Sequence, residues 1–329
     1  MSKLPLTVAI SDYDHVRDFA NGGVAAEGIE ANFLTLSIEE IFFRFSRYRE
    51  WDVSEMSMAK YCSLRSQGDD TLSAIPVFPS RMFRHSSIFV LEDGPVKKPE
   101  DLRGRKVGIP EWAQTAAVYT RGLIVHDWGI PLAEVDWVQA GVSDRGRAEK
   151  VKLDLPKGVT LTPLPERTLD DLLLAGDVAA VMTAHPLPSF ERGDPRVVRL
   201  FPDYPKVEEA HYRKTGIFPI MHVLAVKNAV LEANPWAATS LLKAFEEAKR
   251  RSLARTFEMT ASRFPIPWGV DYAERMKAIF GGDYFPYGIE ANRVTLAAFL
   301  KFAHEQGVCH RLLRPEDLFP ETVRSAFKV

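Results

Sequence analysis

The residues best suited to bind an anion gather in the stretch between residues 78 and 122. Arg81, Arg84 and His85 come just before Ser86–Leu91, a β-branched and aromatic run that predicts a buried strand. Three cationic or ionisable side chains at one strand end could hold a carboxylate or a phosphate. The alternative is that the arginines lie on a solvated surface.

The same stretch continues with a strand, a tight loop and a helix start. Lys106–Ile109 predicts the strand, Glu111 lies in the loop, and the helix begins at Gln114 and Thr115. A helix start presents unpaired N–H groups and a partial positive charge, and both attract anions. If the two strand ends face each other, two cationic surfaces meet at one ligand. The loop could equally be a plain connection.

Two further polar residues follow predicted strands, where open α/β sheets bind ligands. Asp14 comes after the run Leu4–Ile10, and Ser57 comes after a short strand that begins near Trp51. The Ser57 hydroxyl and the backbone N–H groups beside it could hold a carboxylate. Asp14 could do no more than cap the helix that follows it.

Composition and charge exclude several classes of protein. The chain has 329 residues, which suggests two domains, with 46% hydrophobic and 26% charged residues, as in soluble globular proteins. A net charge of −2 and the lack of a basic stripe interleaved with aromatics argue against nucleic-acid binding. No G-x-G-x-x-G follows the first strand, which disfavours a dinucleotide enzyme.

Cysteine usage and hydropathy predict a cytoplasmic protein. The two cysteines, Cys62 and Cys309, are far apart and lack metal-type spacing, so neither a disulfide framework nor a Cys-x-x-Cys zinc site is expected. The N-terminal residues lack the apolar core of a signal peptide, and no stretch is long enough to span a membrane.

The order of predicted strands and helices indicates two lobes that the chain crosses twice. We expect residues 1–90 and 206–329 to form a discontinuous first lobe and residues 91–205 to form the second. The predicted strand Met221–Val226 brings the chain back. Two crossings would give two hinge strands with a ligand cleft between the lobes.

This pattern resembles the type 2 periplasmic-binding-protein fold, an α/β architecture of two lobes with mixed sheets flanked by helices. The chain also contains several longer motifs, which are Asp12-Tyr13-Asp14, Val53-Ser54-Glu55-Met56-Ser57, Ile75 to Arg81, Phe83-Arg84-His85-Ser86, Val107 to Glu111, Thr215 to His222, Tyr287-Gly288 and His304 to Gly307. Through these motifs it resembles the 4,5-dihydroxyphthalate decarboxylase family over nearly its full length.

The chain departs from the family at two positions that we expect to face the cleft. His185 stands where relatives have arginine, and Trp112 stands where tyrosine is usual. These departures bear on the substrate more than on the chemistry.

The resemblance implies loss of CO2 from 4,5-dihydroxyphthalate, which gives protocatechuate and needs no redox cofactor. The ring carbon that loses its carboxylate lies para to a hydroxyl, so deprotonating that hydroxyl pushes electron density onto the carbon, which takes a proton. The enzyme must hold the spectator carboxylate, accept the phenol proton and supply an acid at the ring carbon. A cation held tightly on the leaving carboxylate would slow the step.

The resemblance also suggests a role for each candidate residue. Arg81 is assigned to the spectator carboxylate, because its planar fork binds two oxygens. Further candidates for substrate binding are Ser57, Gln114, Thr115, Asp14 and His185, the last of these at the catechol hydroxyls or a carboxylate.

Three residues are candidates for proton transfer. His222 and His85 are candidates because an imidazole titrates near neutral pH. Glu111 is a candidate acid or phenol acceptor if desolvation raises its pKa. Each has a structural alternative: His222 could be a core histidine, His85 could brace Arg84, and Glu111 could cap a helix.

The metal question and the class of function stay open at the level of sequence. His185, His222, Glu111 and Asp14 could converge on a divalent ion, although the sequence has no HExxH motif. A non-catalytic binding protein for an aromatic carboxylate is the alternative function, and such a protein would need no proton donor. The expected partner is a small aromatic dicarboxylate, and self-association into a homo-oligomer stays open.

Overall fold

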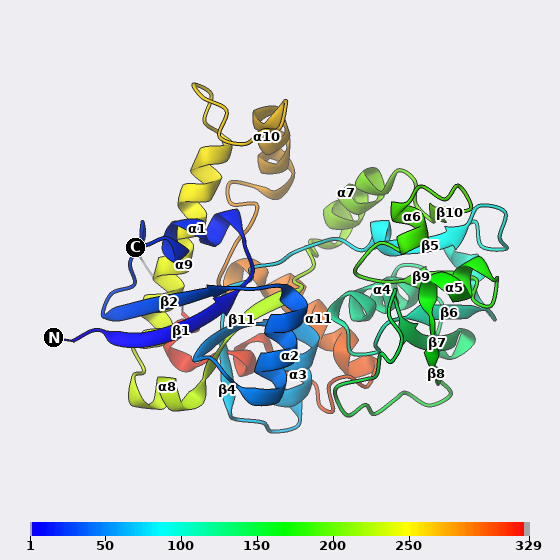
Figure 1. Ribbon diagram of the computed structural model, residues 1–329, viewed down its shortest axis with the longest axis horizontal. Coiled ribbons are helices and arrows are strands. Elements are labelled where there is room, and N and C mark those ends of the chain that lie inside the picture. The colour runs from blue at the N-terminus through cyan, green and yellow to red at the C-terminus, as the bar shows by residue number, and fades with distance from the viewer. Residues whose placement is uncertain (1, 326–329) are drawn as a thin grey trace.

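The structure, a computed structural model, describes residues 2–325, which form two lobes side by side (Figure 1). Each lobe contains one mixed sheet flanked by helices, as the sequence predicts. The chain enters the second sheet at Ile88 and returns to the first at His222. The finer division at residues 90 and 206 stays a prediction.

The first sheet has the strand order β2-β1-β3-β11-β4. Strand β1 is parallel to β2 and β3, whereas β11 is antiparallel to β3 and β4. Its strands are β1 (Leu4–Ile10), β2 (Ile29–Thr35), β3 (Val53–Ser57), β4 (Leu72–Ile75) and β11 (His222–Lys227).

The second sheet has the order β10-β5-β9-β6-β7-β8, with a parallel part from β9 to β8 and an antiparallel part formed by β5 and β10. Its strands are β5 (Ile88–Leu91), β6 (Lys106–Ile109), β7 (Asp136–Gly141), β8 (Thr160–Thr168), β9 (Ala180–Met182) and β10 (Val197–Arg199).

Eleven α-helices lie among the described residues. They are α1 (Asp14–Ala20), α2 (Ile38–Tyr48), α3 (Met58–Ser66), α4 (Thr115–His126), α5 (Leu169–Leu174), α6 (Pro188–Glu191), α7 (Tyr204–Thr215), α8 (Asn228–Ala233), α9 (Ala237–Thr256), α10 (Gly269–Phe280) and α11 (Arg293–Glu305).

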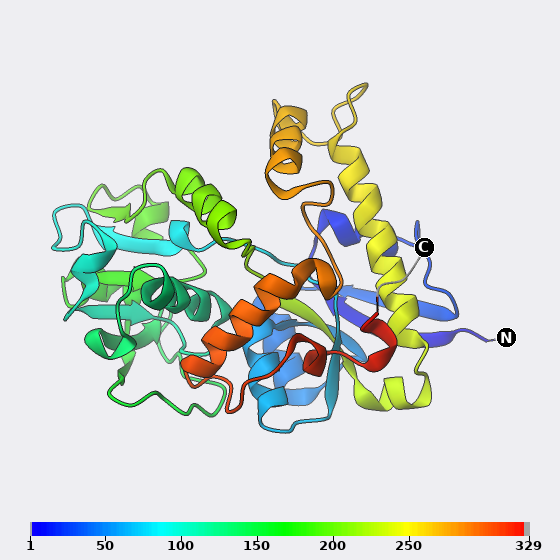
Figure 2. The same cartoon turned by 180° about the vertical axis from the view of Figure 1, so that it is seen from behind.

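Helix α11 joins the two lobes. It packs on α3 of the first lobe and on α4 of the second, and the view from behind shows it running across the boundary (Figure 2). No helix of residues 2–325 is long and apolar enough to cross a membrane.

Sequence patterns locate most elements, and the exceptions have physical causes. The predicted bounds of β1, β6 and α4 match those observed. Strand β8 contains Pro163 and Pro165, which interrupt a strand pattern but are tolerated because β8 lies at the sheet edge. Residues 202–212 read as irregular, yet most of them belong to α7, which has proline in its first turn and ends at Gly216 with φ +69°.

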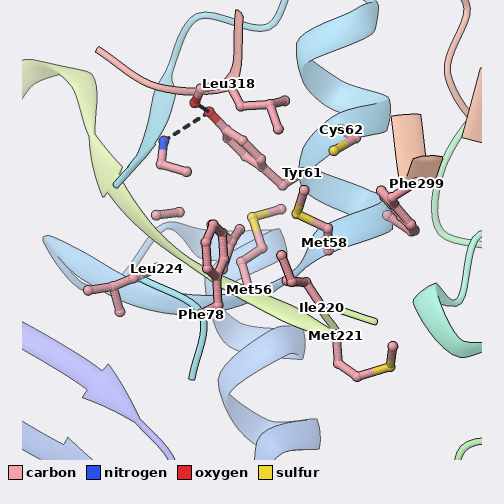
Figure 3. Close-up of a cluster of buried hydrophobic side chains, with 14 of the residues drawn as sticks. Met56, Met58, Tyr61, Cys62, Phe78, Ile220, Met221, Leu224, Phe299 and Leu318 are labelled. Carbon is pink, nitrogen blue, oxygen red and sulfur yellow. Dashed lines mark hydrogen bonds between the residues drawn. The ribbon is translucent and has the colours of Figure 1, made fainter. Parts of the chain in front are cut away.

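An apolar cluster in the first lobe supports the strand ends described below. Met56, Met58, Tyr61, Phe78 and Met221 all belong to this buried cluster, in which the Met221 side chain points away from the Tyr61 ring (Figure 3). The Tyr61 hydroxyl donates to the Leu318 carbonyl and accepts from the Ala74 N–H group at 2.8 Å. These bonds attach a C-terminal segment to β4 and α3. They therefore hold in place the start of α3, which belongs to the site described below.

Candidate functional site

A buried carboxylate on β3 organises the polar groups at one edge of the first sheet. Glu55 Oε1 accepts hydrogen bonds from the Tyr13 hydroxyl and from His222 Nδ1, both at 2.6 Å. Its other oxygen accepts the Ser11 N–H group at 3.0 Å. Glu55 is completely buried, whereas His222 stays slightly exposed. One carboxylate therefore joins the end of β1 to the start of β11.

The charge state of Glu55 determines the protonation of its two partners. Burial acts to raise the pKa of Glu55, but the hydrogen bonds it accepts outweigh burial, chiefly that from His222, and leave the pKa below its usual value. Burial, together with the Glu55 charge, raises the pKa of Tyr13 well above its usual value, so Tyr13 remains a donor. Because a carboxylate only accepts, His222 carries its proton on Nδ1.

The other ring nitrogen of His222 is available for chemistry. Among the described residues, no partner forms a hydrogen bond with His222 Nε2. The Phe42 ring packs edge-on against the imidazole, with ring centroids 4.9 Å apart. His222 is thus oriented from two sides and can give or take a proton at Nε2.

Ser57 lies beside His222 and joins the starts of two helices. The two residues are opposite each other in the antiparallel pair β3–β11, which places their side chains on one face of the sheet. Ser57 Oγ lies 2.9 Å from Thr115 Oγ1, and Thr115 also accepts the Ala59 N–H group at 3.1 Å. The predicted binding residues Ser57 and Thr115 therefore meet, one from each lobe.

The first turns of α3 and α4 converge at this point without acidic caps. Neither helix has an acidic residue in its first turn or a side-chain cap. Gln114, which precedes α4, has a buried Oε1 with no partner in the part of the chain that the structure describes. Two partial positive charges suit an anionic group better than a closed core, whereas the unpartnered Gln114 Oε1 is an acceptor and calls for a donor such as a hydroxyl.

Arg84 is a buried cation that forms no ion pair with the described residues. Its Nε donates to Met221 Sδ at 3.2 Å, and Nη1 approaches the Ala184 carbonyl at 3.4 Å. Burial lowers its pKa to about 10, so Arg84 stays charged at neutral pH. Met221 precedes His222 and Ala184 precedes His185, so this charge lies between strand ends of both sheets, and Glu208 is the acidic group that acts on it from beyond ion-pair distance.

Arg81 is engaged by the protein itself. Nη1 donates to the Phe218 carbonyl at 3.1 Å, and Nη2 donates to the Pro286 carbonyl at 2.7 Å and to Asn292 Oδ1. The guanidinium also lies over three aromatic rings. The two terminal nitrogens of the Arg81 guanidinium thus join separate segments of the chain. This arrangement does not favour the predicted role of Arg81 as the group that binds the spectator carboxylate.

The condition under which Glu111 was a candidate acid, a pKa raised by desolvation, is not met. Burial acts in that direction, but the charges of Lys60 and Arg147 outweigh it, and the pKa lies below its usual value. Glu111 oxygens lie 3.1 Å from Lys60 Nζ, 2.7 Å from Arg147 Nε and 3.4 Å from Lys150 Nζ. Glu111 is thus an ionised carboxylate surrounded by three cations, and its ion pair with Lys60 links α3 to the second lobe.

The remaining predicted residues lie apart from the Glu55 network. Asp14 accepts Ser252 Oγ at 2.5 Å and pairs with Arg255 at 3.2 Å, which ties α1 to α9. His185 is mostly exposed and reaches Glu39 on α2 at 3.1 Å. This pair spans the two lobes at the rim.

His85 and Trp112 also differ from expectation. His85 is buried and packs near the rings of Trp128, Phe201 and His211 rather than against His222. Trp112 does not face a cleft: it is fully buried and donates to the Gln306 carbonyl at 2.7 Å.

Sequence reasoning missed two residues that the structure brings to the site. Tyr13 and Glu55 lay within quoted motifs but received no role, and Arg84 was named only as part of the cationic cluster with Arg81 and His85. A signal existed for Glu55, because a charged residue inside the otherwise apolar or small strand Val53–Ser57 must have buried partners. Nothing in the sequence distinguishes Arg84 from Arg81, because only the fold decides which guanidinium is already engaged.

The four residues predicted to converge on a metal do not come together. Glu111, Asp14 and His185 each pair elsewhere, as described above. Among residues 2–325 one group has a donor set that suits a cation: His85, Asp127 and His211.

A cavity of about 920 Å³ lies away from the Glu55 network, against α9, α10 and residues 286–292. Its charged lining is mixed and consists of Arg81, Lys243, Glu246, Glu247, Arg250, Asp283, Glu290 and Arg324.

Comparison with known proteins gives two curated relatives, and no family model matches. The chain is 36% identical to 4,5-dihydroxyphthalate decarboxylase of Comamonas testosteroni over 330 residues, which covers 100% of both chains. It is also 36% identical to 4,5-dihydroxyphthalate decarboxylase of Pseudomonas putida over 204 residues, or 62% of this chain and 79% of that one.

Solved structures show the same fold at low identity. The periplasmic aliphatic sulphonate binding protein SsuA of Escherichia coli has a TM-score of 0.56 at 13% identity and covers 98% of this chain and 99% of its own. A putative sulfonate-binding protein SsuA of Methylobacillus flagellatus has a TM-score of 0.51 at 11% identity, with 98% and 93% covered. These similarities confirm the predicted periplasmic-binding-protein fold.

Proposed function

We propose, since the chain belongs to the 4,5-dihydroxyphthalate decarboxylase family, that it is a carboxy-lyase that converts 4,5-dihydroxyphthalate to protocatechuate and CO2. The observation that carries this proposal is the identity of 36% along the whole of the Comamonas testosteroni enzyme. The Glu55 network is the proposed site. A buried carboxylate, an oriented imidazole and a buried cation without an ion pair are what this chemistry needs.

Arg84 and the start of α4 are the proposed binders of the spectator carboxylate. A buried arginine without an ion pair is costly, and a substrate carboxylate would reduce that cost beyond what the more distant Glu208 provides. The N–H groups at the start of α4 and the Ser57 and Thr115 hydroxyls would supply further donors to the carboxylate, and the Gln114 Oε1 could accept from a substrate hydroxyl. Substrate binding would thus be strongest on the group that does not react.

His222 is the proposed acid at the ring carbon. Glu55 stabilises the imidazolium through Nδ1 and leaves Nε2–H to donate. The substrate phenolate pushes an electron pair to the carbon para to it, that carbon takes the proton from Nε2, and the carbon–carboxylate bond then breaks. CO2 leaves with restoration of the aromatic ring. The reaction is redox-neutral, so no redox cofactor is part of the proposal.

His185 is the proposed acceptor of the phenol proton. It pairs with Glu39, and this pair connects the exposed surfaces of the two lobes. An imidazole paired with a carboxylate can accept a phenol proton. A cytoplasmic setting completes the proposal, and it is supported by two buried cysteines that are both free.

The large cavity near Arg81 is the less suitable place for a dicarboxylate. Its acidic and basic side chains are equal in number, and Arg81 and Arg250 are already engaged by protein acceptors. It lacks the excess of positive charge that a dianion requires. A non-catalytic binding protein remains the alternative function.

The direct test is turnover of 4,5-dihydroxyphthalate by the purified protein, measured as protocatechuate and CO2 formed with and without a chelator. Turnover is expected in both conditions. Binding seen by calorimetry without any product would replace the carboxy-lyase by the binding protein.

His222→Gln tests the proton donor. We expect kcat to fall by about 10²–10³, with KM nearly unchanged, because the acid acts only in the transition state. His310→Gln is the control, since the side chain of that half-buried histidine bonds only to the Lys152 carbonyl, away from the Glu55 network. Near-normal kcat in His222→Gln would leave this histidine a structural role.

A further inference from the structure

A group of three metal-ligating side chains lies outside the proposed catalytic network. His85, Asp127 and His211 each offer one ligand atom, and these atoms lie within 4.8 Å of one another. His211 Nδ1 is 2.7 Å from Asp127 Oδ2, and the His85 and His211 ring centroids are 5.2 Å apart. Two imidazoles and one carboxylate are a donor set that zinc and similar first-row ions prefer.

An unsatisfied nitrogen points to a missing partner in this group. His85 is only 3% exposed, and its Nδ1 is buried with no hydrogen-bond partner among residues 2–325. Buried ring nitrogens are normally bonded, so this one needs an explanation. Burial and the neighbouring His211 lower the pKa of His85 to about 4, which leaves the ring neutral, the state in which imidazole binds metals.

The surroundings fit a small cation with access from solvent. Trp128 and Phe201 pack around His85 and exclude water on that side. The Asp127 side chain is 19% exposed, which leaves a route in and room for a water ligand. Metal bonds of about 2.1 Å would set the ligand atoms about 3.5 Å apart, so the most distant pair must close by about 1 Å, and His211 Nδ1 and Asp127 Oδ2 must exchange their hydrogen bond at 2.7 Å for a slightly wider separation.

We propose that His85, Asp127 and His211 form a binding site for one divalent first-row transition ion of the zinc class. The three ligands come from different parts of the chain: His85 opens a short 3₁₀ turn, Asp127 ends α4, and His211 lies on α7. The turn directly follows the first crossing between the lobes, and α7 directly precedes the second (Figure 1). A bound ion would fasten both crossings to α4 and fix Arg84, the neighbour of His85.

The site is separate from the proposed reaction. Its ligands have no part in the reaction proposed above, because His85, a proton-transfer candidate from the sequence, packs against His211 and not against His222. The decarboxylation described above needs no metal. Removing the ion is therefore expected to lower stability and leave the chemical step in place.

The test uses the full-length protein after treatment with a chelator and dialysis. We expect the wild type to bind one equivalent of Co²⁺ with a visible ligand-field spectrum, and Zn²⁺ to displace it. Zn²⁺ should also raise the unfolding temperature, because a ligand that binds the folded state stabilises it. A wild type that binds neither ion would overturn the proposal.

Two variants and one control assign the ligands. Asp127→Asn is nearly isosteric and should fold even if His211→Gln does not, and circular dichroism checks both. Each is expected to lose at least about tenfold in metal affinity and the stabilisation by Zn²⁺. His310→Gln should keep both. Wild-type affinity in Asp127→Asn and His211→Gln would place the ion elsewhere, for example at the cysteines, and refute the site.

Discussion

At the scale of single residues, buried ionisable groups are held in one defined state. Glu55 is ionised because three donors surround it, and it fixes the Nδ1 proton of His222. His15 shows the opposite case. Burial lowers the pKa of His15 to about 4 and outweighs the hydrogen bond to the Pro79 backbone, which acts to raise it. The His15 ring is therefore neutral in the folded protein.

His15 is expected to make stability depend on pH. Its pKa is about 4 when folded and about 6.5 when unfolded, so the unfolded chain binds the proton more readily between these values. The stabilisation is complete above pH 6.5 and is lost as the pH falls toward 4. From pH 7.5 to 5.5 the loss should be about 1 kcal/mol in urea unfolding.

His15→Asn removes this titration and keeps a donor for the Pro79 carbonyl. The variant should lose less stability than the wild type over the same pH range, whereas His310→Gln should follow the wild type. An unchanged pH dependence in His15→Asn would show that His15 titrates alike in both states.

At the scale of elements, the starts of α3 and α4 depend on one hydroxyl. Thr115→Val leaves Ser57 Oγ and the Ala59 N–H group without their partner in a buried place. We expect the free energy of unfolding to fall by about 1–3 kcal/mol and KM to rise.

Thr120→Val is the matched control, because Thr120 is equally buried but bonds only to a carbonyl of its own helix. The effect of Thr115→Val on KM is the informative readout. Equal behaviour of the two variants would remove the helix starts from substrate binding.

Arg81 acts between elements as well. It joins the second crossing of the chain, at Phe218, to the loop at Pro286 and Asn292. Arg81→Lys loses the planar fork and the contact with the aromatic rings, and the free energy of unfolding is expected to fall by about 2–3 kcal/mol, with KM unchanged. Urea unfolding measures the loss of stability, and steady-state kinetics measure KM.

Arg293→Lys on the surface is the control and should leave the free energy of unfolding nearly unchanged, because its partners Glu290 and Glu316 are accessible to water. A large rise in KM with full stability in Arg81→Lys would instead show that Arg81 binds the substrate carboxylate.

At the scale of the whole molecule, a buried network of ion pairs connects the two lobes. Glu111 lies among Lys60, Arg147 and Lys150, and Lys60 itself is almost inaccessible. Glu111→Gln leaves Lys60 buried without a carboxylate, so we expect a loss of about 3–5 kcal/mol in unfolding free energy. The kcat of the protein that remains folded should hardly change.

Glu134→Gln is the control, because its pair with Arg103 is exposed and worth under about 1 kcal/mol. A collapse of kcat in Glu111→Gln at full stability would restore Glu111 as the catalytic acid.

The fold and the family could be predicted because they depend on patterns that are local in sequence. Apolar runs such as Leu4–Ile10 and Lys106–Ile109 specify strands wherever they occur, and the helix at Thr115–His126 follows from its own residues. Alternation of these elements indicates an α/β protein with two crossings. The motifs around Arg81 and His222 indicated the family, which the relatives confirm.

The state of each polar side chain was decided only by tertiary structure. Arg81 and Arg84 are three residues apart and chemically identical, yet one is surrounded by acceptors and the other forms no ion pair with the described residues. Glu111 and Glu55 are both buried carboxylates, but cations surround the first and a histidine shares the second. Charge, pKa and availability depend on partners that lie far along the chain, so residue type and spacing determine which chemistry is open and the fold decides which residue is left to perform it.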